Sequence, residues 1–229
     1  MRLARDGAAV GILDLNLDDS QKVADEITAA GGKAIALQAS VSDRAQVVDA
    51  FAKLRQAFGP VTILVNNAGI TGFVPFKELT DEQWDKMLEV NLKGTFICTQ
   101  VALPDMEAES WGRIVNISSS SAQTGAILMA HYSASKGAMV SLTRSLAQEL
   151  GPLGITVNNI PPGSVMQTIM SEANKARFQI PEETLLQTVP VRRLGVPDDI
   201  AGACAWLVSE GAGYVTGQTI GVNGGRVVT

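Results

Sequence analysis

The sequence has few of the side chains that form disulfides or bind metal ions. Its 229 residues include two cysteines and one histidine. Cys98 and Cys204 are far apart in the sequence, and each has apolar neighbours in a helix-like segment, where a free thiol behaves as a small hydrophobe. We therefore expect no disulfide and no metal site, so that catalysis has to rely on other side chains.

Basic clusters and long apolar runs are also missing. Lys and Arg total 18 against 23 Asp and Glu, a net charge of −5 at pH 7. Without a basic stripe to neutralise phosphates, nucleic acid is not expected as a partner. No apolar run approaches the ~20 residues that span a membrane, and the N-terminus lacks the apolar core of a signal peptide. We expect a cytoplasmic protein without a membrane partner.

What is present is an alternation of strand-like and helix-like segments. Hydrophobic residues make up 46% of the chain, enough for one sizeable core, and the alternation is typical of β-α units around a parallel sheet. Strands are predicted at residues 8–13, 33–39, 61–66, 112–118, 155–160 and 218–222. Helices are predicted at residues 18–30, 43–58, 81–107, 131–150 and 198–209. The sequence predicts one α/β domain over residues 1–229.

Tyr132 and Lys136 lie four residues apart in the segment Tyr-Ser-Ala-Ser-Lys. Residues with this spacing share one face of a helix, so the lysine charge can favour the phenolate. Moving a tyrosine pKa from ~10 to about 7 takes roughly 4 kcal/mol of differential stabilisation. The pair therefore predicts an acid/base catalyst. The alternative is an ordinary helix with a buried tyrosine and a solvated lysine.

Two strand-like segments end in turns with polar or glycine residues. Asn-Asn-Ala-Gly at 66–69 follows the apolar run 61–65, and Pro162-Gly163 follows the strand-like residues 155–158. Apolar runs of this kind are typical of buried parallel strands, and ligands bind at the carboxyl ends of such strands. We expect both turns to lie at a ligand site.

The spacing of further polar residues completes a recognisable set. Asn91 lies twenty-eight residues before Ser119, which lies thirteen before Tyr132. Together with the turns above, these residues resemble the short-chain dehydrogenase/reductase family in its compact, NAD(P)-dependent form. The resemblance extends to Thr-Gly-Gln at 216–218 and Asn-Gly-Gly at 223–225. It implies a Rossmann-like, doubly wound parallel sheet.

The resemblance assigns roles to four catalytic residues. Tyr132 is the general acid in ketone reduction and the general base in alcohol oxidation. Lys136, together with the charge of an oxidised nicotinamide, is expected to lower the phenol pKa and to bind the nicotinamide ribose. Ser119 is expected to donate a hydrogen bond to the substrate oxygen. Asn91 is expected to hold a helix kink and a water that links Lys136 to solvent; its alternative is a polar residue that merely interrupts a helix. Ser118, Ser120 or Ser121 would take the role of Ser119 only if the serine run were aligned differently with the family motif.

The same resemblance implies a nicotinamide dinucleotide cofactor. Asp14 ends the first strand-like segment, where an acid accepts hydrogen bonds from the adenosine ribose and repels a 2′-phosphate, so NAD is favoured over NADP. A capping or turn role for Asp14 is the alternative. Ser40 stands where members usually carry an Asp, which weakens the adenine contact. The expected cofactor contacts are Asp14, Val41, Asn66, Ala68, Gly69, Tyr132, Lys136, Pro162, Gly163 and Val165.

The family's first strand and its Thr-Gly-x-x-x-Gly-x-Gly turn are absent from the sequence. Residues 2–6 read instead as the end of the helix that follows that turn, with Gly7 as its cap. Because the first strand is central in the family's sheet, we expect two neighbouring strands with unpaired backbone groups and an apolar gap. Either the sequence starts late, or the truncation is natural and weakens cofactor binding.

The leading interpretation is an NAD-dependent oxidoreductase that acts on a secondary alcohol or its ketone. Alternatives are a 3-oxoacyl thioester (acyl-carrier-protein) reductase, whose usual NADPH conflicts with Asp14, and a non-catalytic truncated member. Apolar residues near the cleft, namely Phe73, Ile127, Leu128 and Met129, indicate a hydrophobic substrate.

The family resemblance also implies a homodimer or homotetramer that assembles through helices 81–107 and 131–150. We expect residues 164–193 to cover the cleft and His131 to line it or face a subunit contact, with proton transfer as the lesser alternative.

Overall fold

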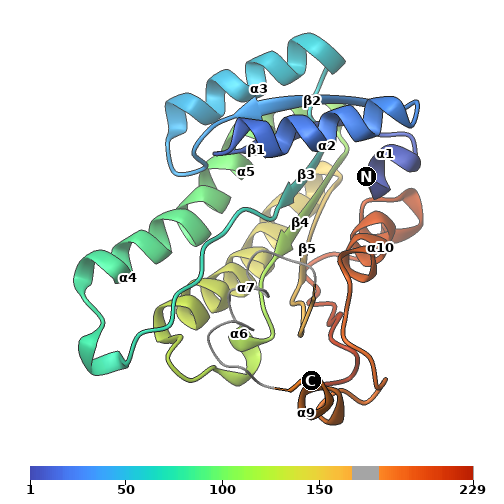
Figure 1. Cartoon of the computed structure of the whole chain (residues 1–229). Coiled ribbons are helices and arrows are strands. Elements are labelled where there is room, and N and C mark those ends of the chain that lie inside the picture. Colours follow the sequence, from blue (N-terminus) through green and yellow to red (C-terminus); the bar gives the residue numbers. More distant parts are fainter. Residues whose placement is uncertain (167–180, 229) are drawn as a thin grey trace.

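A computed structural model describes residues 1–166 and 181–228 of the chain (Figure 1). Its strands are β1 (Ala9–Asp14), β2 (Lys33–Gln38), β3 (Ile63–Asn66), β4 (Gly112–Ile117) and β5 (Ile155–Ile160). Its α-helices are α1 (Arg2–Arg5), α2 (Leu17–Ala29), α3 (Arg44–Phe58), α4 (Asp81–Leu88), α5 (Gly94–Glu109), α6 (Ser121–Thr124), α7 (Ala130–Leu150), α9 (Glu182–Gln187) and α10 (Pro197–Leu207). Short helical segments are η1 (Phe76–Glu78), η2 (Glu89–Lys93), η3 (Gly151–Leu153) and η4 (Glu210–Ala212).

The strands form two separate parallel sheets, β1-β2 and β3-β4-β5. Within the described residues no strand joins β1 to β3, and β1 and β2 lie apart from the other three strands (Figure 1). All six residues of β5 are buried, whereas no residue of β1 is. This confirms the predicted gap at the centre of a doubly wound sheet, and it leaves one hydrogen-bonding edge of β1 and one of β3 unpaired.

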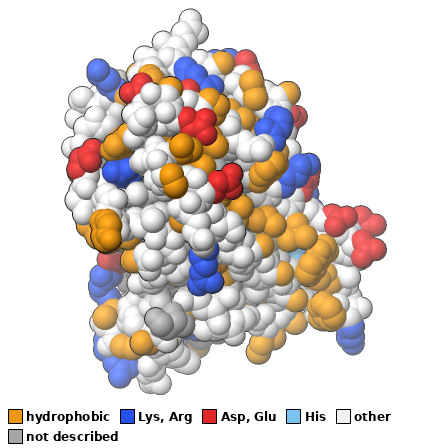
Figure 2. Space-filling model, turned by 180° about the vertical axis from the view of Figure 1, so that it is seen from behind, with side chains coloured by type: hydrophobic (Ala, Val, Ile, Leu, Met, Phe, Trp, Pro, Cys, Tyr) orange, Lys and Arg blue, Asp and Glu red, His pale blue; other side chains and the backbone are white. Residues whose placement is uncertain are grey.

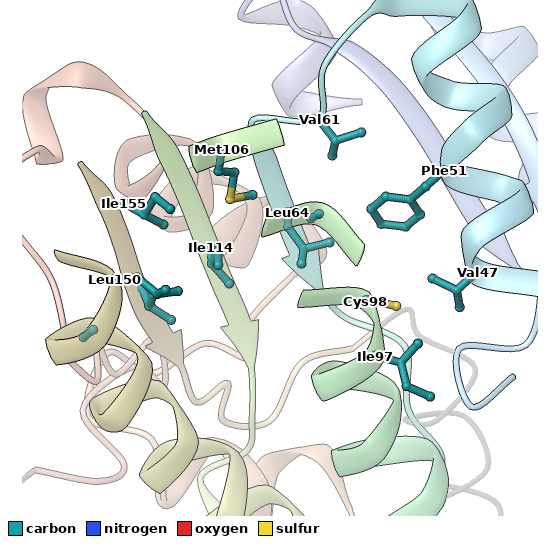
Figure 3. Close-up of a cluster of buried hydrophobic side chains, with 13 residues drawn as sticks. Val47, Phe51, Val61, Leu64, Ile97, Cys98, Met106, Ile114, Leu150 and Ile155 are labelled. Carbon is teal, nitrogen blue, oxygen red and sulfur yellow. The ribbon is translucent and has the colours of Figure 1, made fainter. Parts of the chain in front are cut away.

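Apolar side chains on alternate strand positions pack against helices on both faces of the β3-β4-β5 sheet. Ile114 belongs to a cluster with residues of α3, α5 and α7, among them Phe51, Ile97 and Leu150 (Figure 3). Val115, the next residue, packs on the other face in a cluster that includes residues of α10. This alternation follows from the period of two in a strand. Because β3, β4 and β5 are parallel, their carboxyl ends lie at one edge of the sheet.

Local sequence signals account for most element boundaries. Asn16 and Asp43 accept hydrogen bonds from the first backbone amides of α2 and α3. Thr80 and Gln83 form a capping box at the start of α4, with Gln83 N donating to Thr80 Oγ1 over 3.3 Å. Gly7 adopts a φ of 99° after α1, in agreement with its predicted role as a cap.

Two predicted elements differ in the structure. Residues 218–222 form isolated parallel bridges, Asn159 with Thr219 and Pro162 with Val222, instead of a regular strand. The single helix expected at 81–107 is interrupted by the π-helical segment η2 between α4 and α5. π-Helical turns are often found at functional sites, and η2 contains Asn91.

Among the described residues, no helix combines the length and the apolar character that crossing a membrane requires.

Candidate active site

A cavity of about 1090 Å³ opens at the carboxyl ends of β1, β3, β4 and β5. This volume is slightly larger than the ~300–1,000 Å³ usual for small-molecule sites. It is lined by most of the residues that the sequence indicated, namely Asp14, Ala68, Gly69, Ser119, Tyr132, Lys136, Pro162, Gly163 and Val165. Strand ends that are distant in sequence therefore meet at one site, as the fold class predicts.

Tyr132 and Lys136 lie on the buried face of α7. Their exposed fractions are 6% and 4%, and Lys136 Nζ lies 6.0 Å from the centroid of the Tyr132 ring. Nζ donates a hydrogen bond of 2.8 Å to the carbonyl of Ile117, the last residue of β4. The ammonium is therefore fixed between the helix and the end of the strand, which excludes the alternative of a solvated lysine.

Burial dominates the electrostatics of this pair in the protein alone. Burial raises the pKa of the Tyr132 phenol, and a hydrogen bond with Ser119 acts in the opposite direction. Burial also lowers the pKa of the Lys136 ammonium to about 8. The predicted lowering of the phenol pKa requires Lys136 together with an oxidised nicotinamide and stays a prediction; in the protein alone, desolvation of the phenol is the largest effect. A bound oxidised nicotinamide would add a further positive charge beside the phenol.

The burial of Lys136 gives a prediction for stability against pH. Its pKa of about 8 in the folded protein is below the usual 10.5, so the unfolded chain binds more protons between these values and stability rises with pH there. Relative to Lys136→Met, the unfolding free energy of the parent should increase by about 3 kcal/mol between pH 8 and 10.5. Urea titrations of both proteins at several pH values measure this. A difference that does not change with pH would contradict the assigned burial.

Ser119 lies in the turn between β4 and α6. Its Oγ accepts a hydrogen bond of 3.1 Å from the amide of Ser121 and lies 3.0 Å from the Ser121 Oγ. The turn is held by backbone bonds from Ser118 N to the Ile160 carbonyl and from Ser120 N to the Pro162 carbonyl, both 2.9 Å. The position of Ser119 beside the phenol matches its expected role as a donor to the substrate oxygen.

Asn91 fixes the loop that follows β3. Its Oδ1 accepts a bond of 2.8 Å from Ile70 N, and its Nδ2 donates to the Ile70 carbonyl and to Ser135 Oγ, both at 3.0 Å. A Cβ on Gly69 would lie 3.1 Å from Asn91 Oδ1 and 3.3 Å from Lys136 Nζ. The expected helix interruption is confirmed, and the water link from Lys136 to solvent stays a prediction. The sequence did not indicate Ser135, although it lies one helical turn from Tyr132.

Two expected cofactor contacts do not line the cavity. The amide of Asn66 is buried, and its Nδ2 donates to Asn116 Oδ1 over 2.8 Å. Asn116 in turn donates to Thr143 Oγ1 over 2.9 Å, so the side chains join β3, β4 and α7. The Val41 side chain packs against Gly94 at the start of α5. Any contact that these residues make with a cofactor has to come from their backbone.

The histidine and the apolar rim are only partly where the sequence placed them. His131 is 2% exposed and does not line the cavity, so the expectation that it lines the cleft or faces a subunit contact is wrong. Its Nε2 is directed at Gly72, and proton transfer to substrate is not supported either. Phe73 and Met129 line the cavity as expected. Ile127, in contrast, is 89% exposed because its side chain projects into solvent.

The described residues omit 167–180, about half of the segment expected to cover the cleft. The described ends of that segment do reach the cavity. Ser164, Val165 and Met166 on one side and Leu185 of α9 on the other belong to its lining. The interpretation of 164–193 as a cover therefore remains a prediction.

The cavity residues fit the two ends of a nicotinamide dinucleotide. The exposed Asp14 lies at one end, where its Oδ1 accepts a bond of 2.9 Å from Asn16 N, and Tyr132 and Lys136 lie at the other. Between these ends the described residues offer no glycine-rich turn for a pyrophosphate. Asp14 and Lys136 would hold the two riboses, while the middle of such a cofactor has no dedicated contacts here.

Comparisons with known proteins show which proteins the chain is similar to. The family profile described as "Enoyl-(Acyl carrier protein) reductase" matches residues 1–226. Acetoacetyl-CoA reductase of Cupriavidus necator is 38% identical over 225 residues, which cover 98% of this chain and 90% of that protein. The 3-oxoacyl-(acyl-carrier-protein) reductase of Staphylococcus aureus is also 38% identical, with 98% and 90% covered.

A solved structure is similarly close. The crystal structure of a putative gluconate dehydrogenase from Agrobacterium tumefaciens superposes with a TM-score of 0.93 at 31% identity. The match covers 98% of this chain and 88% of that one. The two-sheet arrangement is thus compatible with the architecture of an enzyme that has a similar sequence.

Proposed function

Because the chain belongs to the short-chain dehydrogenase/reductase family, we propose that it interconverts a secondary alcohol and its ketone by hydride transfer with NAD. The observation that carries this proposal is the meeting of Ser119, Tyr132 and Lys136 in one cavity at the carboxyl edge of the strands. Family membership alone does not place these side chains together.

The proposed chemistry divides the work among three side chains. The nicotinamide supplies or accepts the hydride when bound. In ketone reduction Tyr132 gives its Oη proton to the substrate oxygen, while the Ser119 hydroxyl donates a hydrogen bond to the same oxygen. Lys136 is buried near the phenol and bonds to the Ile117 carbonyl, and it would hold the nicotinamide ribose of a bound cofactor. In alcohol oxidation the proton moves in reverse.

A 3-oxoacyl thioester is the second candidate substrate. Two relatives named for 3-oxoacyl or acetoacetyl thioesters are 38% identical to this chain. The apolar lining from Phe73, Met129 and Leu185 suits an acyl chain or another hydrophobic ketone. Assays of NADH oxidation with acetoacetyl-CoA and with a neutral aliphatic ketone test both candidates. If neither acetoacetyl-CoA nor the ketone is reduced, the non-catalytic alternative is favoured.

The position of Asp14 gives a prediction for the choice between NAD and NADP. The Asp14 carboxylate would accept hydrogen bonds from the ribose of NAD and would repel the 2′-phosphate of NADP. Asp14→Ala should therefore weaken NAD binding and reduce the preference for NAD over NADP by about tenfold, or ~1.4 kcal/mol. Titration calorimetry with both cofactors measures the ratio, in the 229-residue chain and in a fusion with a family-type strand and turn before Met1. Asp25→Ala, an exposed acid on α2, serves as the control. An unmodified protein with equal affinity for both would contradict the role of Asp14.

We also propose that the protein assembles as a homodimer or homotetramer through α4, α5 and α7. On the face turned away from Figure 1, hydrophobic side chains gather beside a group of acidic ones (Figure 2). Phe96 of α5 is 42% exposed, and the small residues Ser133 and Gly137 of α7 permit close helix approach. Sedimentation equilibrium of the purified chain tests this proposal.

A further inference from the structure

We propose that Arg226 binds an anionic group of the substrate, a carboxylate or a phosphate, at the end of the cavity beside the loop after β5. The inference rests on the proposed oxidoreductase function and deepens it, since it names a substrate class. Arg226 and Ser164 both belong to the lining of the cavity that contains Tyr132. The sequence had not indicated either residue, because a single arginine near a chain end has no motif.

The guanidinium of Arg226 is held in place from the cavity side. Its Nη1 donates a hydrogen bond of 2.6 Å to Ser164 Oγ. Ser164 directly follows Pro162-Gly163, and its carbonyl accepts a bond of 3.0 Å from Gly195 N. The cation is therefore tied to the loop that follows β5, beside the residues expected to meet the nicotinamide.

The turn that contains Arg226 is fixed by hydrogen bonds of the Asn223 side chain. Asn223 is 9% exposed, and its side chain accepts from Gly225 N over 2.9 Å and donates to the Val227 carbonyl over 3.1 Å. Gly224 and Gly225 have φ values of 65° and 84°, which side chains with a Cβ rarely adopt. Since the turn is already ordered, little conformational freedom is lost when Arg226 binds a ligand.

The charge balance of the cavity favours an anion at this end. Among residues 1–166 and 181–228, the charged side chains of its lining are Arg2, Lys136, Arg226 and Asp14, in a chain with a net charge of −5. Arg2 pairs with Asp6 at 3.1 Å, and Lys136 bonds to a carbonyl. Over residues 1–166 and 181–228, no carboxylate lies within 4.0 Å of Arg226. A planar guanidinium without a counter-ion suits bidentate binding of a carboxylate or phosphate.

Binding measurements on the 229-residue chain test this directly. Titration calorimetry compares the affinities of oxo acids of increasing length with those of their methyl esters. Acetoacetyl-CoA is included as a ligand because its coenzyme A moiety carries phosphates. We expect at least one acid, or the thioester, to bind tenfold or more tightly than the neutral ester. Arg226→Met should abolish that difference, and Arg226→Lys should retain part of it because the charge stays while the bidentate fork is lost. Arg144→Met, an exposed arginine on α7, is the matched control.

The outcomes separate this site from the proposed reaction. Equal binding of acids, thioester and esters by the parent, or undiminished anion binding by a folded Arg226→Met, would overturn the assignment. Preference for the acids identifies a carboxylate, and preference for the thioester alone identifies a phosphate. Turnover of the neutral ester by the fusion that adds a family-type strand and turn before Met1 reports the oxidoreductase function independently of the anion. A fusion that binds NADH and the anion yet never turns over the ester would contradict the reaction and not the site.

Discussion

Tyr132→Phe is expected to lower turnover by about 10²–10⁴-fold while NADH affinity changes little. The substitution removes the transferable proton and keeps the ring, which is 6% exposed and packed on the buried face of α7. A phenol carries its proton at neutral pH, as a proton donor in ketone reduction must. Steady-state rates and calorimetric NADH affinities, measured on the same samples, check both parts.

The chain offers a matched control for this substitution. Tyr214 is the only other tyrosine in the sequence and is fully exposed, so Tyr214→Phe makes the same chemical change away from the cavity. Its turnover should equal that of the parent. Near-parental activity of Tyr132→Phe on a ketone substrate would show that the proton comes from another group.

The second large effect concerns the gap between β1 and β3. We expect the 229-residue chain to bind NADH poorly, and a fusion that adds a family-type strand and glycine-rich turn before Met1 to bind it at least a hundredfold more tightly. The added strand would pair with the free edges of β1 and β3, where each buried unsatisfied group costs about 1–3 kcal/mol. The added turn would supply backbone donors for the pyrophosphate. Calorimetry measures the affinity, and thermal unfolding measures the effect on stability.

A second fusion separates the two contributions. With the same strand but valines in place of the glycines of the turn, sheet closure should still raise the melting temperature, whereas NADH affinity should stay low. Micromolar NADH binding by the 229-residue chain itself would mean that another segment binds the pyrophosphate in place of the glycine-rich turn.

The sequence was sufficient where local rules decide the outcome. Tyr132 and Lys136 share a helix face because residues four apart always do, and the turns after β3, β4 and β5 meet because parallel strands end at one edge. Thr80 followed three residues later by Gln83 is a sequence pattern typical of a helix start, and α4 begins there. The gap between β1 and β3 was predictable because the fold assigns a central strand to that position.

The sequence was insufficient where the outcome depends on tertiary packing. The direction of the Tyr132 pKa shift is set by desolvation, which no spacing reveals. Asn66 lies in the buried polar chain with Asn116 and not in the cavity, because the preceding strand directs its side chain to the core. The site at Arg226 depends on a turn near the chain end that meets the loop after β5, a contact between residues 62 positions apart.

Transfer of deuterium from labelled NADH tests the central claim most directly. The fusion is incubated with a ketone and with NADH that carries deuterium on one face of C4, and the product alcohol is analysed by mass spectrometry and NMR. The proposed function predicts deuterium at the carbinol carbon for one of the two C4 faces, in the parent and not in Tyr132→Phe. Tight NADH binding together with product that never contains deuterium, whichever face is labelled, would contradict it.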